Sequence, residues 1–250
     1  SAEQGDARSQ LHMALYLQNN FTDSDNHRMA LKWFTLAAEQ GHIESQHCLG
    51  TLYEGHFYNN DEDKDLEKAS YWYTQAAKLG NASSQAFLGN CYRWGKGVPK
   101  DTNKAILWLT KAAKQGDDYA QNYLAEIYEN ENKDIKKALY WLEKAVEQGY
   151  MYAQSNLARI YADGVGVDQD WEKAFDLYKK AAKQGEVDSL CCLGHMHEKG
   201  YGVTQNYEKA INWYRKAIDQ GDADSMFFLG MLYLEGKGVD KSLPDAAYWI

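Results

Sequence analysis

Three residues in the last quarter of the sequence have types that could carry out chemistry together. Cys191, His195 and Glu198 stand at i, i+4 and i+7, a spacing that places them on one face of a helix. A thiol beside an imidazole can act as a nucleophilic pair, and the same groups could supply part of a metal site. No second cluster with matching spacing occurs in the sequence. We therefore expect no enzyme activity, no bound metal and no cofactor.

An acidic stretch, Asp61 to Asp65, places carboxylates at alternate positions, as a calcium-binding loop does. Such a loop also needs a glycine at its sixth position and a glutamate at its twelfth. Leu66 and Trp72 stand there instead. The stretch is therefore interpreted as a solvated loop.

Four Gly-x-Gly-Val segments invite comparison with glycine loops that bind phosphate. No strand pattern precedes them, and neither a third glycine nor a Lys-Ser/Thr pair follows. We interpret them as turns between helices, in which the valine anchors the turn. They occupy residues 95–98, 164–167, 200–203 and 236–239.

The elements that must position all these residues are set by a repeat. Seven glycines, which we call the period glycines, are separated by 36, 39, 36, 33, 36 and 36 residues. Self-similarity at this period indicates an array of helical units, each packed on its neighbours. The period glycines are Gly5, Gly41, Gly80, Gly116, Gly149, Gly185 and Gly221.

Each unit reads as two helices. In the first, a small residue nine positions after the period glycine follows a leucine in six of seven units, which predicts a point where a neighbouring backbone approaches closely. The second carries the pattern Lys-Ala-x-x-Trp-Tyr-x-x-Ala-Ala and ends at the next period glycine, which can take positive φ. Its predicted N-caps are Asn26, Asp65, Asp101, Asp134, Asp170, Asn206 and Ser242.

These motifs together resemble the Sel-one-like repeat, a 36-residue relative of the tetratricopeptide repeat, over essentially the whole chain. The departures are local: repeat four lacks the loop glycines, and repeat six has Leu190 for a glutamine and His197 for a tyrosine. The resemblance implies an all-α fold, a right-handed α-solenoid superhelix of antiparallel helix pairs with about six complete repeats. It also implies that the first helices line a concave groove, and that the protein is a scaffold or adaptor.

Composition limits the partners and the compartment. We expect one elongated domain over residues 1–250, and the ragged repeat ends indicate a fragment of a longer protein. No apolar run approaches the roughly 18 residues of a membrane span. The net charge of −9 disfavours nucleic acid and would suit a basic partner. The four cysteines lack periodic pairing, which favours a reducing compartment, whereas the family resemblance leaves an exported or periplasmic bacterial protein open.

The positions that vary between repeats are the candidates for binding. Positions 3, 6, 10 and 13 after each period glycine lie opposite the packing face of the first helix. Tyrosine and arginine are enriched among binding hot spots, and an Asn122 amide could pair with the backbone of an extended peptide. The predicted partner-binding residues are Arg93, Tyr119, Asn122, Glu126, Tyr152, Arg159 and His195.

The variable positions of the first helices lead to an expectation about function. We expect a non-enzymatic scaffold that holds a protein or peptide partner in the groove. One alternative is an assembly role through the array ends, where Phe227, Met231 and Leu234 occupy the variable positions and suggest packing on another segment or chain. Another is an exported bacterial immunity or host-interaction protein, as in other members of the family.

Overall fold

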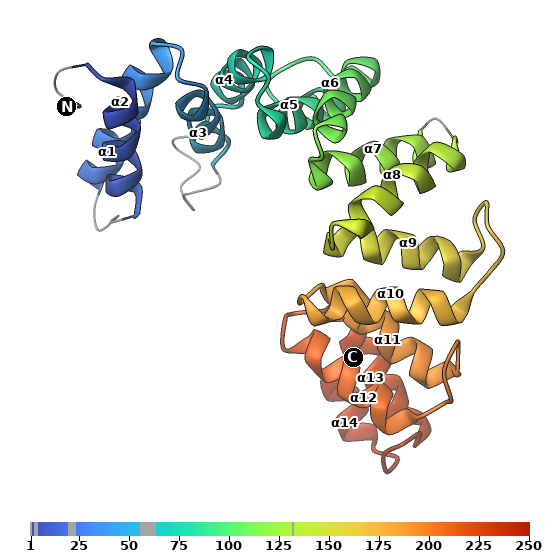
Figure 1. Ribbon diagram of the computed structural model, residues 1–250. Coiled ribbons are helices and arrows are strands. Elements are labelled where there is room, and N and C mark those ends of the chain that lie inside the picture. The colour runs from blue at the N-terminus through green and yellow to red at the C-terminus, as the bar shows by residue number, and fades with distance from the viewer. Residues whose placement is uncertain (1, 3–4, 20–23, 56–63, 132) are drawn as a thin grey trace. The chain divides into compact units, whose positions relative to one another are not determined.

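The computed structural model describes residues 2, 5–19, 24–55, 64–131 and 133–250, and within these residues it contains fourteen helices and no strand (Figure 1). Residues 61–63 of the acidic stretch lie outside this part of the chain. The described helices form two compact units, Ser1–Leu124 and Ala125–Ile250, whose boundary falls within one helix. None of the described helices is long and apolar enough to cross a membrane. The expectation of one continuous domain stays a prediction.

Unit 1 is built from helix pairs in chain order. Each helix packs on the next along the chain, and the first helices of adjacent repeats, α3 and α5, also contact each other. The helices are α1 (Ala7–Asn19), α2 (Ser24–Glu39), α3 (Ile43–Glu54), α4 (Leu66–Lys78), α5 (Ala82–Trp94), α6 (Thr102–Lys114) and α7 (Asp118–Asn130), which contains the boundary.

Unit 2 repeats this arrangement, with α11 and α13 as the contacting first helices. The prediction of an all-α solenoid of stacked helix pairs is thereby confirmed. Its helices are α8 (Ile135–Glu147), α9 (Met151–Asp163), α10 (Trp171–Lys183), α11 (Val187–Lys199), α12 (Tyr207–Ile218), α13 (Ala223–Glu235) and α14 (Leu243–Trp249).

The predicted helix ends are confirmed in all but one case. Six of the seven predicted N-caps accept a hydrogen bond from a backbone N–H in the first turn of α4, α6, α8, α10, α12 or α14. Asn26 is the exception, because α2 already begins at Ser24 and includes it. All seven period glycines have positive φ, between 82° and 96°. The helix lengths are therefore set by local capping chemistry, as the sequence indicates.

The small residue of the first helix allows a close approach, as expected, but the approaching group differs between repeats. A Cβ atom added at Gly89 or Gly230 would lie 3.2 Å from a backbone atom of the second helix, the nitrogen of Leu109 or the oxygen of Ala246. A Cβ atom added at Gly50 would overlap the ring of Tyr73, and one added at Gly194 would overlap the ring of Tyr214. The group that approaches closely at these two glycines is therefore an aromatic side chain of the second helix, not a backbone. The glycine lets the tyrosine ring lie directly against the first helix. Both tyrosines are fully buried there, with an exposure of 0%.

We predict that Gly50→Ala destabilises unit 1 by about 1–3 kcal/mol, because the new methyl group forces the Tyr73 ring out of its site. The midpoint of urea unfolding, followed by circular dichroism, measures the loss. In a Tyr73→Ala background the same alanine is expected to cost nothing, since alanine favours helix over glycine. An equal loss in both backgrounds would show that the ring is not the cause.

The aspartate caps give a second prediction, on pH. The pKa values of all four capping carboxyls are lowered by hydrogen bonds from the lysine three residues further along the chain. At Asp65 and Asp134 the main cause is the ammonium group of that lysine. At Asp101 and Asp170 the main cause is the backbone N–H of that lysine. A folded-state pKa below the unfolded value means that the stabilisation is complete above about pH 4 and is lost as the pH falls through the folded pKa values.

The test replaces all four aspartates with asparagine, the residue that caps α12 in this chain as Asn206. We expect near-native stability at pH 7, because asparagine caps as well as aspartate does. We also expect a smaller loss of stability than in the wild type when urea unfolding is repeated toward about pH 3. An unchanged loss on acidification would assign the pH dependence to other groups.

Candidate functional site

A row of aromatic rings runs through the repeats of unit 1. The ring of His47 on α3 lies 5.8 Å from that of Phe87 on α5, measured between centroids, and Tyr73 on α4 stacks on Phe87 at 5.3 Å. Phe87 also stacks on Tyr119 at 5.4 Å, and Tyr119 contacts Tyr123 at 4.4 Å, both on α7. Aromatic pairs at these distances attract each other beyond the area they bury. The row therefore holds α3, α5 and α7 in register.

Polar groups complete this row. The Tyr73 hydroxyl donates to Oε2 of Glu54 at 2.9 Å, and Lys96 lies 3.5 Å from Oε1 of the same carboxylate. Asn90 donates through Nδ2 to the Tyr119 hydroxyl at 2.6 Å. Burial raises the pKa of both tyrosines, and the Glu54 charge raises that of Tyr73 further. Both hydroxyls are therefore protonated and serve as fixed hydrogen-bonding groups, not as bases.

The C-terminal end of α5 carries what we call the Trp94 cluster, formed by Arg93, Trp94 and Tyr123. The guanidinium carbon of Arg93 lies 4.7 Å from the ring centroid of Trp94 and 5.6 Å from that of Tyr123. Arg93 is buried, whereas 58% of Trp94 is exposed. An arginine held over two rings contributes a cation–π attraction and presents the outer ring to solvent in a fixed orientation.

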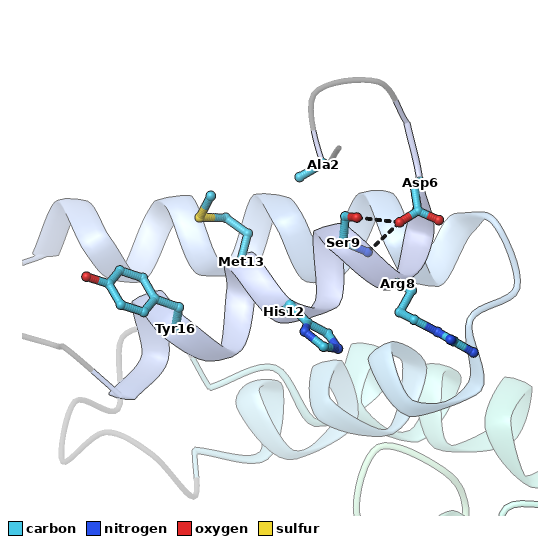
Figure 2. Close-up of a pocket in the computed structure, with 7 residues that line it drawn as sticks. All are labelled: Ala2, Asp6, Arg8, Ser9, His12, Met13 and Tyr16. Carbon is cyan, nitrogen blue, oxygen red and sulfur yellow. Dashed lines mark hydrogen bonds between the residues drawn. The ribbon is translucent and has the colours of Figure 1, made fainter.

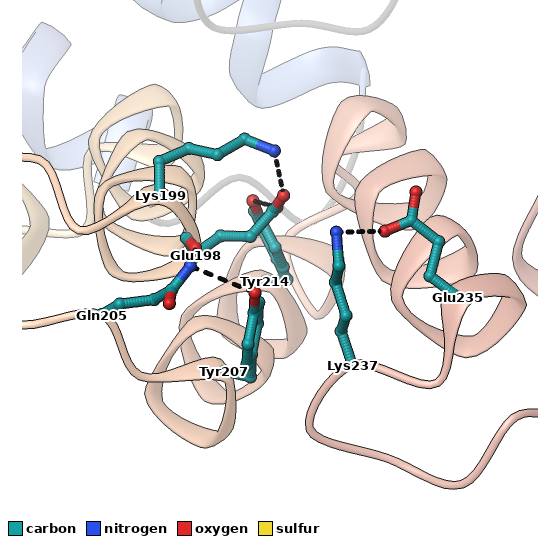
Figure 3. A network of polar contacts seen from close by, with 7 residues as sticks. All are labelled: Glu198, Lys199, Gln205, Tyr207, Tyr214, Glu235 and Lys237. Carbon is teal, nitrogen blue, oxygen red and sulfur yellow. Dashed lines mark hydrogen bonds and ion pairs between the residues drawn. The ribbon is translucent and has the colours of Figure 1, made fainter.

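Unit 2 contains a second copy of the glutamate–tyrosine contact. The Tyr214 hydroxyl donates to Oε2 of Glu198 at 2.8 Å (Figure 3). The Tyr214 ring stacks on Phe228, with 5.5 Å between the ring centroids. Lys199 is hydrogen-bonded to the other oxygen of Glu198. Glu198, Tyr214 and Phe228 occupy the repeat positions that Glu54, Tyr73 and Phe87 hold in unit 1. The constellation occurs in each unit and is therefore interpreted as architecture.

This architecture accounts for the three residues with catalytic types. Glu198 is engaged by Tyr214 and Lys199, and the His195 ring lies between Phe228 at 5.7 Å and Tyr201 at 5.9 Å. Burial lowers the pKa of His195 and raises that of the Cys191 thiol to about 12. The thiol is protonated at neutral pH, so it is a poor nucleophile. Across the described residues, no three His, Cys, Asp or Glu side chains lie close enough to hold one metal ion.

All four cysteines are free thiols. Burial raises the pKa of Cys48 and Cys192 to about 11, and that of Cys91 and Cys191 to about 12. They act as small apolar groups in the packing of their units.

The remaining predicted residues of unit 2 lie on α7 and α9. Arg159 donates through Nη2 to both carboxylate oxygens of Glu129, at 2.6 Å and 2.8 Å. Glu126 accepts a hydrogen bond from Asn156 at 3.5 Å. Tyr152 is 48% exposed, and its ring meets that of Tyr150 edge-on at 5.5 Å. Tyr152 is thus an exposed aromatic side chain on α9.

The variable positions of the first helices are not all exposed. Asn122 is only 2% exposed, and Arg93 and Glu129 are also buried. The Asn122 amide is therefore not available on the surface to pair with a peptide backbone. The binding roles of the other predicted residues stay predictions.

The sequence interpretation missed two aromatic residues of the Trp94 cluster. Trp94 and Tyr123 stand fourteen and seven positions after their period glycines. Both positions vary among the repeats, with Gly55 and Cys48 at the corresponding places in repeat two. A search for variable aromatic residues at every position, instead of at four chosen positions, would have found them.

A hollow of about 490 Å³ lies along α1 (Figure 2). Its clearest polar group, the Asp6 carboxylate, accepts hydrogen bonds from both the backbone and the side chain of Ser9. His12, Met13 and Tyr16 line the rest along one face of the helix. It includes none of the predicted site residues.

Stacked helix pairs, a fixed period and an absence of convergent catalytic groups in the described residues define a tandem-repeat α-solenoid. The Sel1 repeat matches seven stretches of the sequence, and the chain belongs to the Sel1 repeat family. Proteins with this repeat generally mediate protein–protein interaction, and the family is typically non-catalytic. The matched stretches are residues 7–42, 43–81, 82–117, 118–150, 152–186, 188–222 and 223–250.

Solved structures agree with this assignment. A protective antigen of uropathogenic Escherichia coli strains that displays an SLR fold is 30% identical, with a TM-score of 0.83, and the match covers 99% of this chain and 53% of the antigen. This chain thus spans about half the antigen's length. A Sel1 repeat protein from Oxalobacter formigenes is 35% identical, with a TM-score of 0.72 and coverages of 99% and 72%.

A more distant likeness concerns the fold alone. An immunity protein from Pseudomonas aeruginosa is 22% identical over 85% of this chain and 81% of its own, with a TM-score of 0.57. A sequence search of curated proteins gave no match.

The recurring glutamate–tyrosine contact gives a prediction on stability. Tyr214→Phe removes the donor to Glu198, a buried carboxylate, and is expected to cost unit 2 about 1–3 kcal/mol in urea unfolding. Tyr178→Phe is the matched control, because the Tyr178 hydroxyl is hydrogen-bonded to the Cys192 thiol, a weaker partner than a carboxylate. Equal losses in the two variants would contradict a special role for the carboxylate contact.

Proposed function

We propose that this chain is a non-enzymatic scaffold that binds a protein or peptide partner through the faces of its first helices. The observation that carries the proposal is the Trp94 cluster, in which a largely exposed tryptophan rests on a buried arginine. Large exposed aromatic rings are unfavourable in water unless a partner covers them. Tryptophan, tyrosine and arginine are also the residues most enriched among binding hot spots.

The cluster suits binding because it is already ordered. Arg93 and Tyr123 hold the Trp94 ring, and the aromatic row behind Tyr123 is continuous through Tyr119 to Phe87. A partner that stacks on Trp94 would therefore lose little side-chain entropy on binding. Tyr119 supports the cluster from behind instead of forming a separate anchor.

In unit 2, Tyr152 is the proposed anchor. On the same two first helices, α7 and α9, Glu126 and Arg159 offer hydrogen-bonding groups, and the Arg159–Glu129 pair fixes the arginine in place. His195, on α11, is a further partly exposed aromatic ring of a first helix. The net charge of −9 favours a partner with basic side chains.

The test is calorimetric binding to a partner isolated with the wild-type chain. Trp94→Ala and Tyr152→Ala are each expected to weaken binding by about 30-fold, the loss typical of a hot spot. The matched controls lie on second helices of the same units: Tyr71→Ala, at 55% exposure, for Trp94 and Tyr140→Ala, at 53%, for Tyr152. We expect these controls to stay within about twofold of the wild type, as neutral surface positions do.

Two results would contradict the proposal. If all four variants bind like the wild type, the first-helix faces are not the binding surface. If the second-helix controls lose affinity and Trp94→Ala does not, the partner binds the opposite face. Circular dichroism of each variant confirms that its helices are intact.

A further inference from the structure

A basic cavity of about 590 Å³ lies within unit 2, between α10 and α12, at the end of α11. It belongs to neither the first-helix surfaces nor the glutamate–tyrosine contacts. Two aromatic rings, three lysines and a histidine dominate its lining. These residues are Phe175, Trp213, Lys179, Lys209, Lys216 and His197.

The lining of the cavity includes a position at which repeat six departs from repeats two to five. In repeats two to five, the lysine at the start of the second helix lies 5.1–5.3 Å from the ring centroid of a first-helix tyrosine, as Lys104 does from Tyr92. In repeat six that tyrosine is replaced by His197. Lys209 therefore has no tyrosine ring at this position to cover it.

The same repeat also lacks the carboxylate that neutralises this lysine elsewhere. Lys68, Lys104, Lys137 and Lys173 each form an ion pair with the aspartate that caps their helix. In repeat six the cap is Asn206, and the described residues give Lys209 no ion pair. Two independent substitutions thus leave a cation facing an open space.

Two further lysines add to this charge. Lys179 and Lys216 line the cavity, and neither forms an ion pair within the described part of the chain. Lys216 lies 4.2 Å from the Trp213 ring centroid, and Lys179 lies 6.0 Å from that of Phe175. Three cations and two rings therefore meet in one cavity of a chain whose net charge is −9.

His197 supplies a buried polar atom in the wall. It is 6% exposed, and its Nδ1 has no hydrogen-bond partner among the described residues. Burial and the charge of Lys209 lower its pKa, which favours the neutral ring at pH 7, while a backbone hydrogen bond at Thr204 opposes them. With its other nitrogen engaged at Thr204, a neutral ring leaves Nδ1 to accept a hydrogen bond.

We propose that this cavity binds a phosphate monoester carried on an aromatic or apolar body. Three lysines match the charge of about −1.5 to −2 on a phosphate monoester better than the single charge of a carboxylate. Lysines bind phosphate as point charges, without the forked geometry of arginine. The Trp213 and Phe175 rings provide stacking surface for the organic part of the ligand.

Isothermal titration calorimetry of the whole chain with phenyl phosphate tests the proposal. We expect saturable binding at one site, weakening as the salt concentration rises. Lys209→Gln/Lys216→Gln is expected to lower the affinity at least tenfold. The matched control is Lys104→Gln/Lys111→Gln, at the same positions of repeat three, where Lys111 lies 4.1 Å from the Trp108 ring centroid. The control is expected to bind like the wild type.

A restoring variant tests the cavity itself. His197→Tyr/Asn206→Asp returns repeat six to the pattern of repeats two to five, so it is expected to keep the fold by circular dichroism and to lose phenyl phosphate binding. Absence of saturable binding to the wild type, or equal losses in the two lysine variants, would overturn the proposal. Equal affinity for phenylacetate would overturn the assignment to phosphate. Binding of a phosphotyrosine peptide as tight as that of phenyl phosphate would identify a protein as the source of the ester.

Discussion

The close contact between a first-helix glycine and a buried tyrosine is the constraint on which most of the site depends. At Gly50 and Gly194 the missing side chain allows a ring to lie against the helix, and at both places the tyrosine hydroxyl reaches a glutamate at the helix end. The ring then offers its far face to a phenylalanine of the next repeat. The spacing of the two helices, the tyrosine–glutamate hydrogen bond and the aromatic stacking thus all depend on one small residue. A larger side chain at that position would push the two helices apart.

Local chemistry explains why so much of this fold is predictable from sequence. A cap such as Asp101 and a glycine such as Gly116 act on their own turn of backbone, so their effect is visible without knowledge of the neighbours. The burial of Asn122 was not predictable in this way, because burial depends on packing against residues distant in the sequence and not on the local turn of backbone. Trp94 was missed for a related reason: its importance comes from Arg93 beneath it and Tyr123 across from it, not from its own position.

Repetition and its interruption have opposite meanings in this chain. Where the same residues recur, as in the two glutamate–tyrosine contacts, they hold helices together and are occupied by that task. Where a repeat departs from the pattern, side chains lose their usual partners. Trp94 is exposed where repeat two has Gly55, and Lys209 lacks the aspartate found in four other repeats. Candidate binding sites in such arrays are therefore best sought by comparing the partners of equivalent residues.

The free thiols have a practical consequence for the dynamics of the array. Cys48 and Cys91 lie in unit 1, and Cys191 and Cys192 in unit 2. Burial raises the pKa of each thiol, so it stays protonated and reacts slowly with an alkylating reagent while its surroundings are closed, although only Cys91 is fully buried and the other three are half-buried. The chain consequently carries natural reporters of local opening in both units. Mass spectrometry of the alkylated peptides would rank the units by the free energy of opening, without any added label.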